Sequence, residues 1–364
     1  MRICVVLGTR PEIIKMSPVI RECERLDSDF FILHTGQHCS YAMDGVFFEQ
    51  LALPKARYNL QVNSRSHAQQ TGRMLMGIEH VLKHEKPNIV LVEGDTNTVL
   101  AGALASVKLR IKVGHVEAGL RSYDREMPEE INRVVADHCS DLLFAPTEES
   151  KKVLLNEGIP EGRVFVTGNT IVDALFQNLE IAKKRNVDLS RLGVDEEAYF
   201  LATVHRQENV DSKERFNGIL HGLREVHRKY KLPVIYPIHP RARKRFKTFK
   251  LNAEEISLID PLDYLTFLRL ESNARLVLTD SGGVQEETCI LKVPCVTLRC
   301  NTERPETLRV GSNLLAGTDP DSIVEKTAAM LERSASWENP FGDGRAGQRI
   351  IEIIERTSAG SIKG

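Results

Sequence analysis

The chain has 364 residues, of which 41% are hydrophobic and 27% are charged, as is typical of a globular protein large enough for two domains. Its formal net charge of -1 argues against a nucleic-acid partner, because nucleic-acid binders usually carry a basic excess. The sequence shows no signal peptide, no run near the roughly 20 apolar residues that span a bilayer, and no C-x-x-C pair among its seven cysteines. We therefore expect a cytoplasmic protein with no membrane partner and no bound metal.

The first half of the chain alternates short apolar runs with longer amphipathic stretches. Its predicted strands are Arg2–Leu7, Phe30–His34, Asn88–Val92, Lys112–His115, Leu142–Ala145 and Val164–Thr167. Its predicted helices are Glu12–Leu26, Ser66–Glu85, Asn97–Val107, Pro128–Cys139 and Glu148–Glu157. This alternation predicts a parallel sheet covered by helices on both faces.

The same pattern then begins again in the second half. Its predicted strands are Tyr199–Val204, Val234–Ile238, Ile256–Ile259, Leu276–Thr279, Cys295–Leu298 and Asn313–Leu315. Its predicted helices are Ser212–Tyr230, Asp263–Ser272, Val284–Leu291, Asp319–Glu332 and a last one at Arg345–Glu355. We expect an N-terminal Rossmann-like domain over residues 1–170 and a C-terminal one over 171–364. It stays open whether the last helix, at about 345–356, packs back on the N-terminal domain.

Two doubly wound α/β domains in tandem predict where a ligand would bind. Ligands of such sheets lie beyond the carboxyl ends of the strands. We therefore expect the two domains to face each other across a cleft, with polar residues that follow strands converging on it.

The loop after the first strand offers a basic group beside a helix start. Pro11 suits the first turn of a helix, so free backbone N–H groups and Arg10 can face an anion there. The alternative is a simple helix start with a surface arginine. The sequence has neither the G-x-G-x-x-G fingerprint nor a phosphate-binding G-x-x-x-x-G-K-[ST] loop at this point, which argues against a nicotinamide cofactor.

Acidic residues follow three further strands or turns of the first half. Asp95 lies in GDTNT, Glu117 in GHVEAGLR, and Glu129 and Glu130 in MPEEINR. Asp95 can instead cap a helix, and the two glutamates can simply favour a helix N-terminus. Crowded together in one cleft, carboxyl groups would acquire the raised pKa values that acid–base catalysis uses.

The second half places a different chemistry after its strands. His205 and His239 each follow a strand, although a single histidine is as often structural. The run Ser281-Gly282-Gly283 opens a helix whose free N–H groups suit a diphosphate, and Glu287 can accept both hydroxyls of a ribose. Arg304 adds a further cation.

Eleven motifs, in this order, make the chain resemble the non-hydrolysing UDP-N-acetylglucosamine 2-epimerases, from the first strand to about Ile354. They are GTRPEIIKM, TGQH, GDTNT, GHVEAGLRS, MPEEINR, TGNTIVDAL, HRQEN, HP, LTDSGGVQEE, NTERPE and NPFGDGRA. The resemblance implies a GT-B-like fold and a homodimer. It also implies interconversion of UDP-N-acetylglucosamine and UDP-N-acetylmannosamine.

The resemblance also carries residue roles, matched motif by motif. It makes Asp95, Glu117 and Glu129 the catalytic carboxylates, and it links His205 to the loss and return of UDP. The substrate and UDP contacts that it implies, or that follow from the loops above, are Arg10, Lys15, His239, Phe267, Ser281, Gly282, Gly283, Glu287 and Arg304.

One segment departs from the family pattern. Bacterial members carry a QHREMLDQ-like segment at a second, activating site for the substrate, and here it keeps only Gln37 and His38 before Cys39 and Ser40. Either this chain lacks activation by the substrate, or it uses altered contacts at a regulatory site for which Gln37 and His38 are the candidates.

The reaction that the resemblance implies is elimination of UDP to a 2-acetamidoglucal, followed by its return to the sugar. Breaking the bond from carbon 1 to UDP acidifies the hydrogen on carbon 2, so acids and a diphosphate site are both needed. No net oxidation occurs, and we expect no cofactor. The alternatives are a hydrolysing 2-epimerase, a GT-B glycosyltransferase and a non-catalytic nucleotide-sugar sensor.

Overall fold

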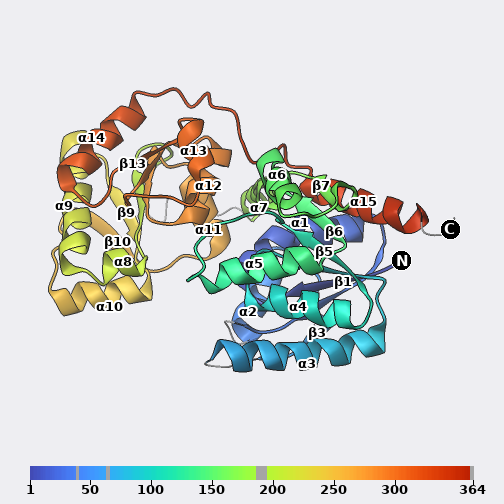
Figure 1. The fold of residues 1–364 in the computed structure, drawn as a ribbon. Helices are drawn as coiled ribbons and strands as arrows, with labels where there is room; N and C mark the ends of the chain where they lie inside the picture. The colour runs from blue at the N-terminus through green and yellow to red at the C-terminus, as the bar shows by residue number, and fades with distance from the viewer. Residues whose placement is uncertain (38–40, 63–65, 186–194, 361–364) are drawn as a thin grey trace. The chain divides into compact units, whose positions relative to one another are not determined.

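A computed structural model describes residues 1–37, 41–62, 66–185 and 195–360. The chain divides into two compact units, the first made of Met1–Gln177 and Phe341–Gly364 and the second of Asn178–Pro340. Each unit is a parallel sheet covered by helices (Figure 1), which confirms the predicted α/β class with two Rossmann-like, doubly wound domains. None of the helices in the described ranges has the length and apolarity that a membrane crossing requires.

The first unit has a seven-stranded sheet in the order β3-β2-β1-β4-β5-β6-β7. Its strands are β1 (Arg2–Leu7), β2 (Asp29–His34), β3 (Tyr58–Asn59), β4 (Ile89–Glu93), β5 (Lys112–Val116), β6 (Leu142–Ala145) and β7 (Val164–Val166). All of β4 is buried, as expected of a parallel strand with helices over both faces. The sequence analysis missed β3, a two-residue strand too short to show a period.

Several helices of the first unit begin after a serine or threonine whose side chain accepts a hydrogen bond from the first turn, namely Ser66, Thr96 and Thr147. The helices of this unit are α1 (Arg10–Arg25), α2 (Tyr41–Gln50), α3 (His67–Glu85), α4 (Asn97–Lys108), α5 (Pro128–Cys139), α6 (Glu148–Asn156), α7 (Thr170–Lys184) and α15 (Ala346–Gly360), with a short 3-10 turn at Glu161–Arg163. Helix α1 begins at Arg10, earlier than predicted, because Thr9 and Glu12 form a capping box and Pro11 is tolerated in the first turn.

The second unit has a six-stranded sheet in the order β10-β9-β8-β11-β12-β13. Its strands are β8 (Phe200–Thr203), β9 (Val234–Pro237), β10 (Ile256–Ile259), β11 (Leu276–Thr279), β12 (Cys295–Thr297) and β13 (Asn313–Leu315). Its helices are α8 (Gln207–Val210), α9 (Lys213–Tyr230), α10 (Pro240–Phe249), α11 (Tyr264–Ser272), α12 (Gly282–Leu291), α13 (Pro305–Arg309) and α14 (Pro320–Leu331). Phe200 and Ala202 of β8 pack into one core and Leu201 into another, so apolar side chains cover both faces of the sheet.

The boundary between the units differs from the predicted break after residue 170. It falls within α7, because the first turns of that helix pack in the first unit and Asp173 binds the N-terminus of α15. The Asp173 carboxylate accepts hydrogen bonds from the backbone N–H groups of Ala346 at 3.2 Å and Gly347 at 2.9 Å. Helix α15 thus lies beside α1 in the first unit (Figure 1), where a Cβ at Gly347 would approach the backbone of Pro18 to 3.0 Å.

Both sheets have the doubly wound strand order 3-2-1-4-5-6 when the strands of each unit are numbered from one. The first sheet adds β7 at its edge. The order reverses between β1 and β4 in the first unit and between β8 and β11 in the second. Loops diverge at such a switch point, and ligands of doubly wound sheets bind there. We therefore expect the candidate residues to lie around these two switch points.

Candidate functional site

Two glutamates pair with one lysine at the switch point of the first sheet, and a third glutamate lies on the same helix as that lysine. Glu93 ends β4, Glu117 follows β5, and Lys15 of α1 lies between them. The Lys15 ammonium lies 2.5 Å from Glu117 Oε2 and 3.4 Å from Glu93 Oε1. The third, Glu12, is buried in the first turn of α1. The structure thus brings the predicted Lys15 and Glu117 together.

Burial favours the protonated form of two of these acids by raising their pKa values. It raises the pKa of the Glu93 carboxyl well above its usual range, against the lowering effect of Lys15 and with help from the charge of Glu117. Burial also raises the pKa of Glu12 to about 7, although Glu12 accepts hydrogen bonds from Thr96 and two backbone N–H groups. Sequence analysis missed both residues, although a glutamate at the end of the apolar run IVLVE signals a buried acid.

Asp95 lies just beyond β4 and is held from two sides. Its carboxylate lies 2.5 Å from the Arg133 guanidinium, and its backbone carbonyl accepts a hydrogen bond from the Asn132 amide at 2.9 Å. The Asp95 side chain keeps 30% of its surface exposed. It is therefore oriented and still accessible to a ligand.

The two acids of the PEE motif have different surroundings. Glu130 is buried and accepts hydrogen bonds from the backbone of Ser122 at 2.8 Å and Tyr123 at 3.0 Å. It therefore ties down the loop after β5. Glu129 is partly exposed, and no hydrogen bond or ion pair to it is found within the described ranges. Of the two, Glu129 is the one whose carboxylate is available to a ligand.

A buried charge network holds the segment that carries Glu117. His115 Nδ1 lies 2.7 Å from Asp137, and its Nε2 bonds the carbonyl of Gly94 at 2.8 Å. Arg121 lies 2.7 Å from the other oxygen of Asp137. Burial alone would raise the pKa of Asp137, but His115 and Arg121 outweigh it and lower the pKa. Glu117 has a φ of 66°, a strained value for a residue with a side chain, which this network stabilises.

Two further predicted residues of the first unit contact neighbouring side chains or backbone within that unit. The Arg10 guanidinium stacks on the ring of Phe47 at 4.9 Å. Gln37 accepts hydrogen bonds from the backbone N–H of Thr98 at 2.9 Å and from its hydroxyl at 2.8 Å, so it holds the start of α4. His38 lies outside the described residues, and the regulatory role of this segment stays a prediction.

One buried acid organises the switch point of the second sheet. Asp280 follows β11 and is fully buried. It accepts hydrogen bonds from the backbone N–H groups of His205 at 3.1 Å and Arg206 at 3.0 Å, and from the amide of Asn209 at 3.1 Å. His205 Nδ1 also lies 3.1 Å from Asp280, so Nε2 of this ring is left to face a ligand. Burial would raise the pKa of Asp280, but His205 and these donors lower it.

His239 lies near His205, because β8 and β9, the strands that these two residues follow, are neighbours in the sheet. The two ring centroids are 6.0 Å apart. Burial lowers the pKa of His239, and the neighbouring His205 and Arg241 lower it further. The Nδ1 of His239 accepts a hydrogen bond from the backbone N–H of Arg241 at 3.2 Å, which also caps α10.

The first turn of α12 carries two glycines with free space around them, although the packing of the helix does not require glycine there. A Cβ at Gly282 would meet nothing closer than Glu303 at 3.6 Å, and one at Gly283 would meet only Ser281 at 3.9 Å. Neither glycine has a positive φ. Packing therefore does not require glycine here, whereas an anion approaching the free N–H groups of the helix would.

The remaining candidates of the second unit lie around this helix. Arg304 pairs with the buried Glu286 of α12 at 2.7 Å. Phe267 of α11 packs partly buried against the core beneath. Glu287 lies beside the fully buried Glu271, whose pKa burial raises well above the usual range, with a further increase from Glu287.

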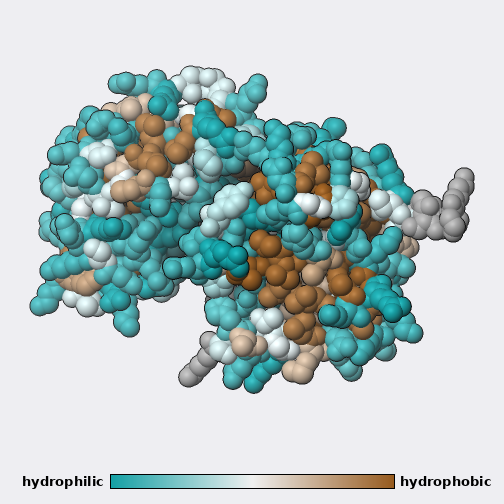
Figure 2. Space-filling view, in the orientation of Figure 1, coloured by the Kyte–Doolittle hydropathy of each residue, from teal (hydrophilic) through white to brown (hydrophobic). Residues whose placement is uncertain are grey.

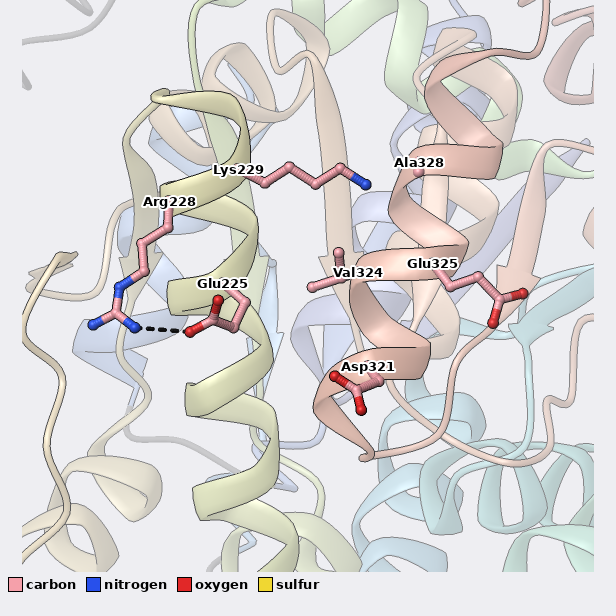
Figure 3. Close-up of a pocket in the computed structure, with 7 residues that line it drawn as sticks. All are labelled: Glu225, Arg228, Lys229, Asp321, Val324, Glu325 and Ala328. Atoms are coloured by element: carbon pink, nitrogen blue, oxygen red, sulfur yellow. Dashed lines mark hydrogen bonds and ion pairs between the residues drawn. The ribbon is translucent and has the colours of Figure 1, made fainter.

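The groove between α9 and α14 is a separate surface feature (Figure 3). It is lined by Glu225, Arg228, Lys229, Asp321, Val324, Glu325 and Ala328. Arg228 and Glu225 pair across 2.8 Å, and none of the candidate residues lines the groove. In the part of the chain that the structure describes, no group of three or more His, Cys, Asp or Glu side chains is arranged to hold a metal ion.

Comparisons with known proteins point to one family. A family model described as UDP-N-acetylglucosamine 2-epimerase matches residues 21–355. UDP-N-acetylglucosamine 2-epimerases of Methanocaldococcus jannaschii and Methanococcus maripaludis are 55% and 54% identical to the chain, covering 97% of it and 99% and 98% of their own lengths. A crystal structure of the M. jannaschii enzyme in complex with UDP-GlcNAc and UDP has a TM-score of 0.86 at 55% identity, covering 98% of this chain and 100% of its own.

Proposed function

Because the chain belongs to the UDP-N-acetylglucosamine 2-epimerase family, we propose that it converts UDP-N-acetylglucosamine reversibly to UDP-N-acetylmannosamine without hydrolysing either. The observation that carries the proposal is that the two units of the chain have switch points of unlike chemistry. One presents carboxyl groups around a lysine, and the other presents a histidine and an open helix N-terminus. The family relative that binds UDP-GlcNAc and UDP supports the same substrate for this chain.

The chemistry requires a leaving group before it requires a base. The hydrogen on carbon 2 has no neighbouring carbonyl, so a carboxylate alone cannot remove it easily. Departure of UDP from carbon 1 creates positive character there and acidifies that hydrogen. Removal of the proton then gives a 2-acetamidoglucal, and return of UDP with a proton on the other face completes the epimerisation. Elimination of UDP and its re-addition each leave the overall oxidation state unchanged, so these steps need no redox cofactor.

The residues divide between these tasks by their surroundings. Ser281, Gly282 and Gly283 offer backbone N–H groups to the departing diphosphate, while His205, fixed by Asp280, neutralises or protonates it. The sugar side is assigned to Asp95, Glu117 and Glu129, one of which takes the proton while another gives one. We further propose that Glu287 contacts the ribose and that Phe267 lies near the uracil.

A homodimer belongs to the same proposal. Apolar side chains stand exposed on three consecutive helices of the first unit, namely Met76 of α3, Val107 of α4 and Ile131 of α5. These helices pack in sequence, α3 on α4 and α4 on α5. The face of the first unit in Figure 2 carries broad hydrophobic surface. Exposed apolar area of this kind favours burial against a second copy.

One experiment separates the proposed reaction from its alternatives. The purified chain is incubated with UDP-N-acetylglucosamine in heavy water, and the sugar is followed by NMR. The proposal expects a mixture of two UDP-sugars that carry deuterium at carbon 2. Free amino sugar would indicate a hydrolysing 2-epimerase, and turnover that depends on an acceptor would indicate a glycosyltransferase. Binding without any change would indicate a sensor.

A further inference from the structure

Glu93 is a buried acid of the first switch point that the proposed reaction leaves without a role. Its residue surface is 2% exposed at the carboxyl end of β4. The Lys15 ammonium faces its Oε1 at 3.4 Å, and that oxygen has no hydrogen-bond partner within the described ranges. A buried carboxyl group is costly to ionise unless a cation or several donors satisfy it. The charge state of Glu93 therefore depends on how the Lys15 ammonium is shared between Glu93 and Glu117.

The charged groups that face Glu93 come from three elements. Helix α1 contributes Lys15 and Glu12, the loop after β4 contributes Asp95, and the segment after β5 contributes Glu117. Three of these four are acids. With like charges this close in a buried setting, the carboxyl groups cannot all be ionised at once.

The distances show which acid holds the ammonium. Lys15 is bonded to Glu117 at 2.5 Å and only approaches Glu93 at 3.4 Å. The Glu117 side chain is also the more exposed of the two, at 8% against 2%. Glu117 is thus the acid favoured as a carboxylate, and Glu93 is the one favoured as a neutral acid.

We propose that Glu93 is a positioning residue of the reaction, which controls through Lys15 how firmly the Glu117 carboxylate is held in place. While Glu93 keeps its proton, the ammonium is committed to Glu117 and holds it ionised and oriented, ready to accept the proton from carbon 2. When Glu93 releases its proton to solvent, two carboxylates compete for one ammonium, and Lys15 no longer holds Glu117 in place. The assignment rests on the proposed function, because it takes Glu117 to act on the sugar.

The consequence is a limit on turnover at alkaline pH. Ionisation of Glu93 should lower kcat with little effect on KM, because the proposed function places UDP on the second unit. A neutral side chain of the same shape should remove this limit. A residue that merely supported the fold would change the unfolding temperature and leave the pH profile alone.

The test uses Glu93→Gln, which mimics the protonated acid, together with Glu93→Met, which is neutral and of similar length. The matched control is Glu85→Gln, a buried acid of the same unit that pairs with Arg2 at 2.5 Å, outside the switch point. At neutral pH both Glu93 variants should keep kcat close to that of the unchanged chain, because they present a neutral side chain to Lys15 as the protonated acid does. At alkaline pH they should lose the fall in kcat that the unchanged chain and the Glu85 control show.

A second measurement keeps the inference separate from the proposed activity. In a chain labelled with 13C at the glutamate carboxyl groups, the Glu117 resonance, assigned with Glu117→Gln, should feel the titration of Glu93 and lose that step in Glu93→Gln. If this step is present while no epimerisation occurs, the proposed function fails and the coupling stands. An unchanged alkaline limb in both variants, or loss of activity at every pH with fold and UDP affinity intact, would overturn the positioning role.

Discussion

The two switch points occupy the same place in sheets of the same strand order, yet they treat a buried acid in opposite ways. Glu93 ends β4 and Asp280 directly follows β11, the equivalent strand of the second sheet. Both residues are nearly inaccessible, at 2% and 0% exposed. Burial raises the pKa of Glu93, whereas the pKa of Asp280 is lowered despite its burial.

The number of donors aimed at each carboxyl group explains the difference. Asp280 receives two backbone N–H groups, the Asn209 amide and His205. Glu93 has one ammonium at 3.4 Å, and that ammonium is bonded more closely to Glu117. Hydrogen bonds to the charged form outweigh desolvation in one unit and do not in the other. Burial alone therefore does not tell whether a strand-end acid is a fixed anion or a proton holder.

The most direct test of the difference between the two switch points is to remove the carboxylates of the first unit. Glu117→Gln and Asp95→Asn should lower turnover by about 10²–10⁴-fold, the usual contribution of a general acid or base. Binding of UDP, measured by calorimetry, should change little because the second unit supplies its site. An exposed acid, Glu161, provides the control as Glu161→Gln. Wild-type rates or lost UDP binding in the first two variants would remove the assignment.

The largest effect on stability is expected at Asp137, the centre of the first unit's buried network. Asp137→Asn leaves His115 and Arg121 without their shared anion, and breaking a buried pair typically costs about 3–5 kcal/mol. Hydrogen exchange of the β5 amides measures this loss in the first unit. Trp337 is the single tryptophan of the chain and lies in the second unit, so its fluorescence serves as an internal control. Unchanged protection of β5 would show that the network is dispensable.

The sequence predicted most strands and helices but only part of the chemistry, and the reason is physical. Runs such as IVLVE and the caps at Thr9 and Ser281 are local signals that neighbouring residues decide. The roles of Glu93 and Asp280 depend on which strands become neighbours, and that is a property of the folded sheet. Motif positions pointed to Lys15 and Glu117 separately, 102 positions apart in the chain. Lys15 and Glu117 come into contact only because β4 and β5 are neighbours in the sheet and α1 lies beside them.

Glu12 sharpens the comparison through the pH dependence of stability. Because its pKa is raised from 4.5 to about 7 in the folded chain, the folded state binds the proton more tightly than the unfolded state does. The associated stability is fully present below pH 4.5 and is lost as the pH rises to about 7, by an amount on the order of 3 kcal/mol. Glu12→Gln should flatten this slope for the β1 and α1 amides in hydrogen exchange. The same slope in the variant would assign the pH dependence to another group.

The smallest expected effect tests the second switch point alone. Gly283→Ala should raise the stability of α12 by a few tenths to about 1 kcal/mol, because alanine favours a helix and its Cβ meets only Ser281 at 3.9 Å. The same methyl group would stand where the diphosphate approaches, so affinity for UDP should fall by about tenfold, or about 1.4 kcal/mol. Calorimetry with UDP and thermal unfolding followed at Trp337 measure the two changes.

The control is Gly222 of α9, where a Cβ would lie 2.7 Å from the side chain of Ile323. Gly222→Ala should therefore lower stability and leave UDP affinity unchanged, the reverse of Gly283→Ala on both measures. One glycine is required by helix packing, and the other is expected to be required only by a ligand. If Gly283→Ala bound UDP as tightly as the unchanged chain, the diphosphate would not lie at the start of α12. The second switch point would then not be a diphosphate site, and its proposed contrast with the carboxylates of the first would fail.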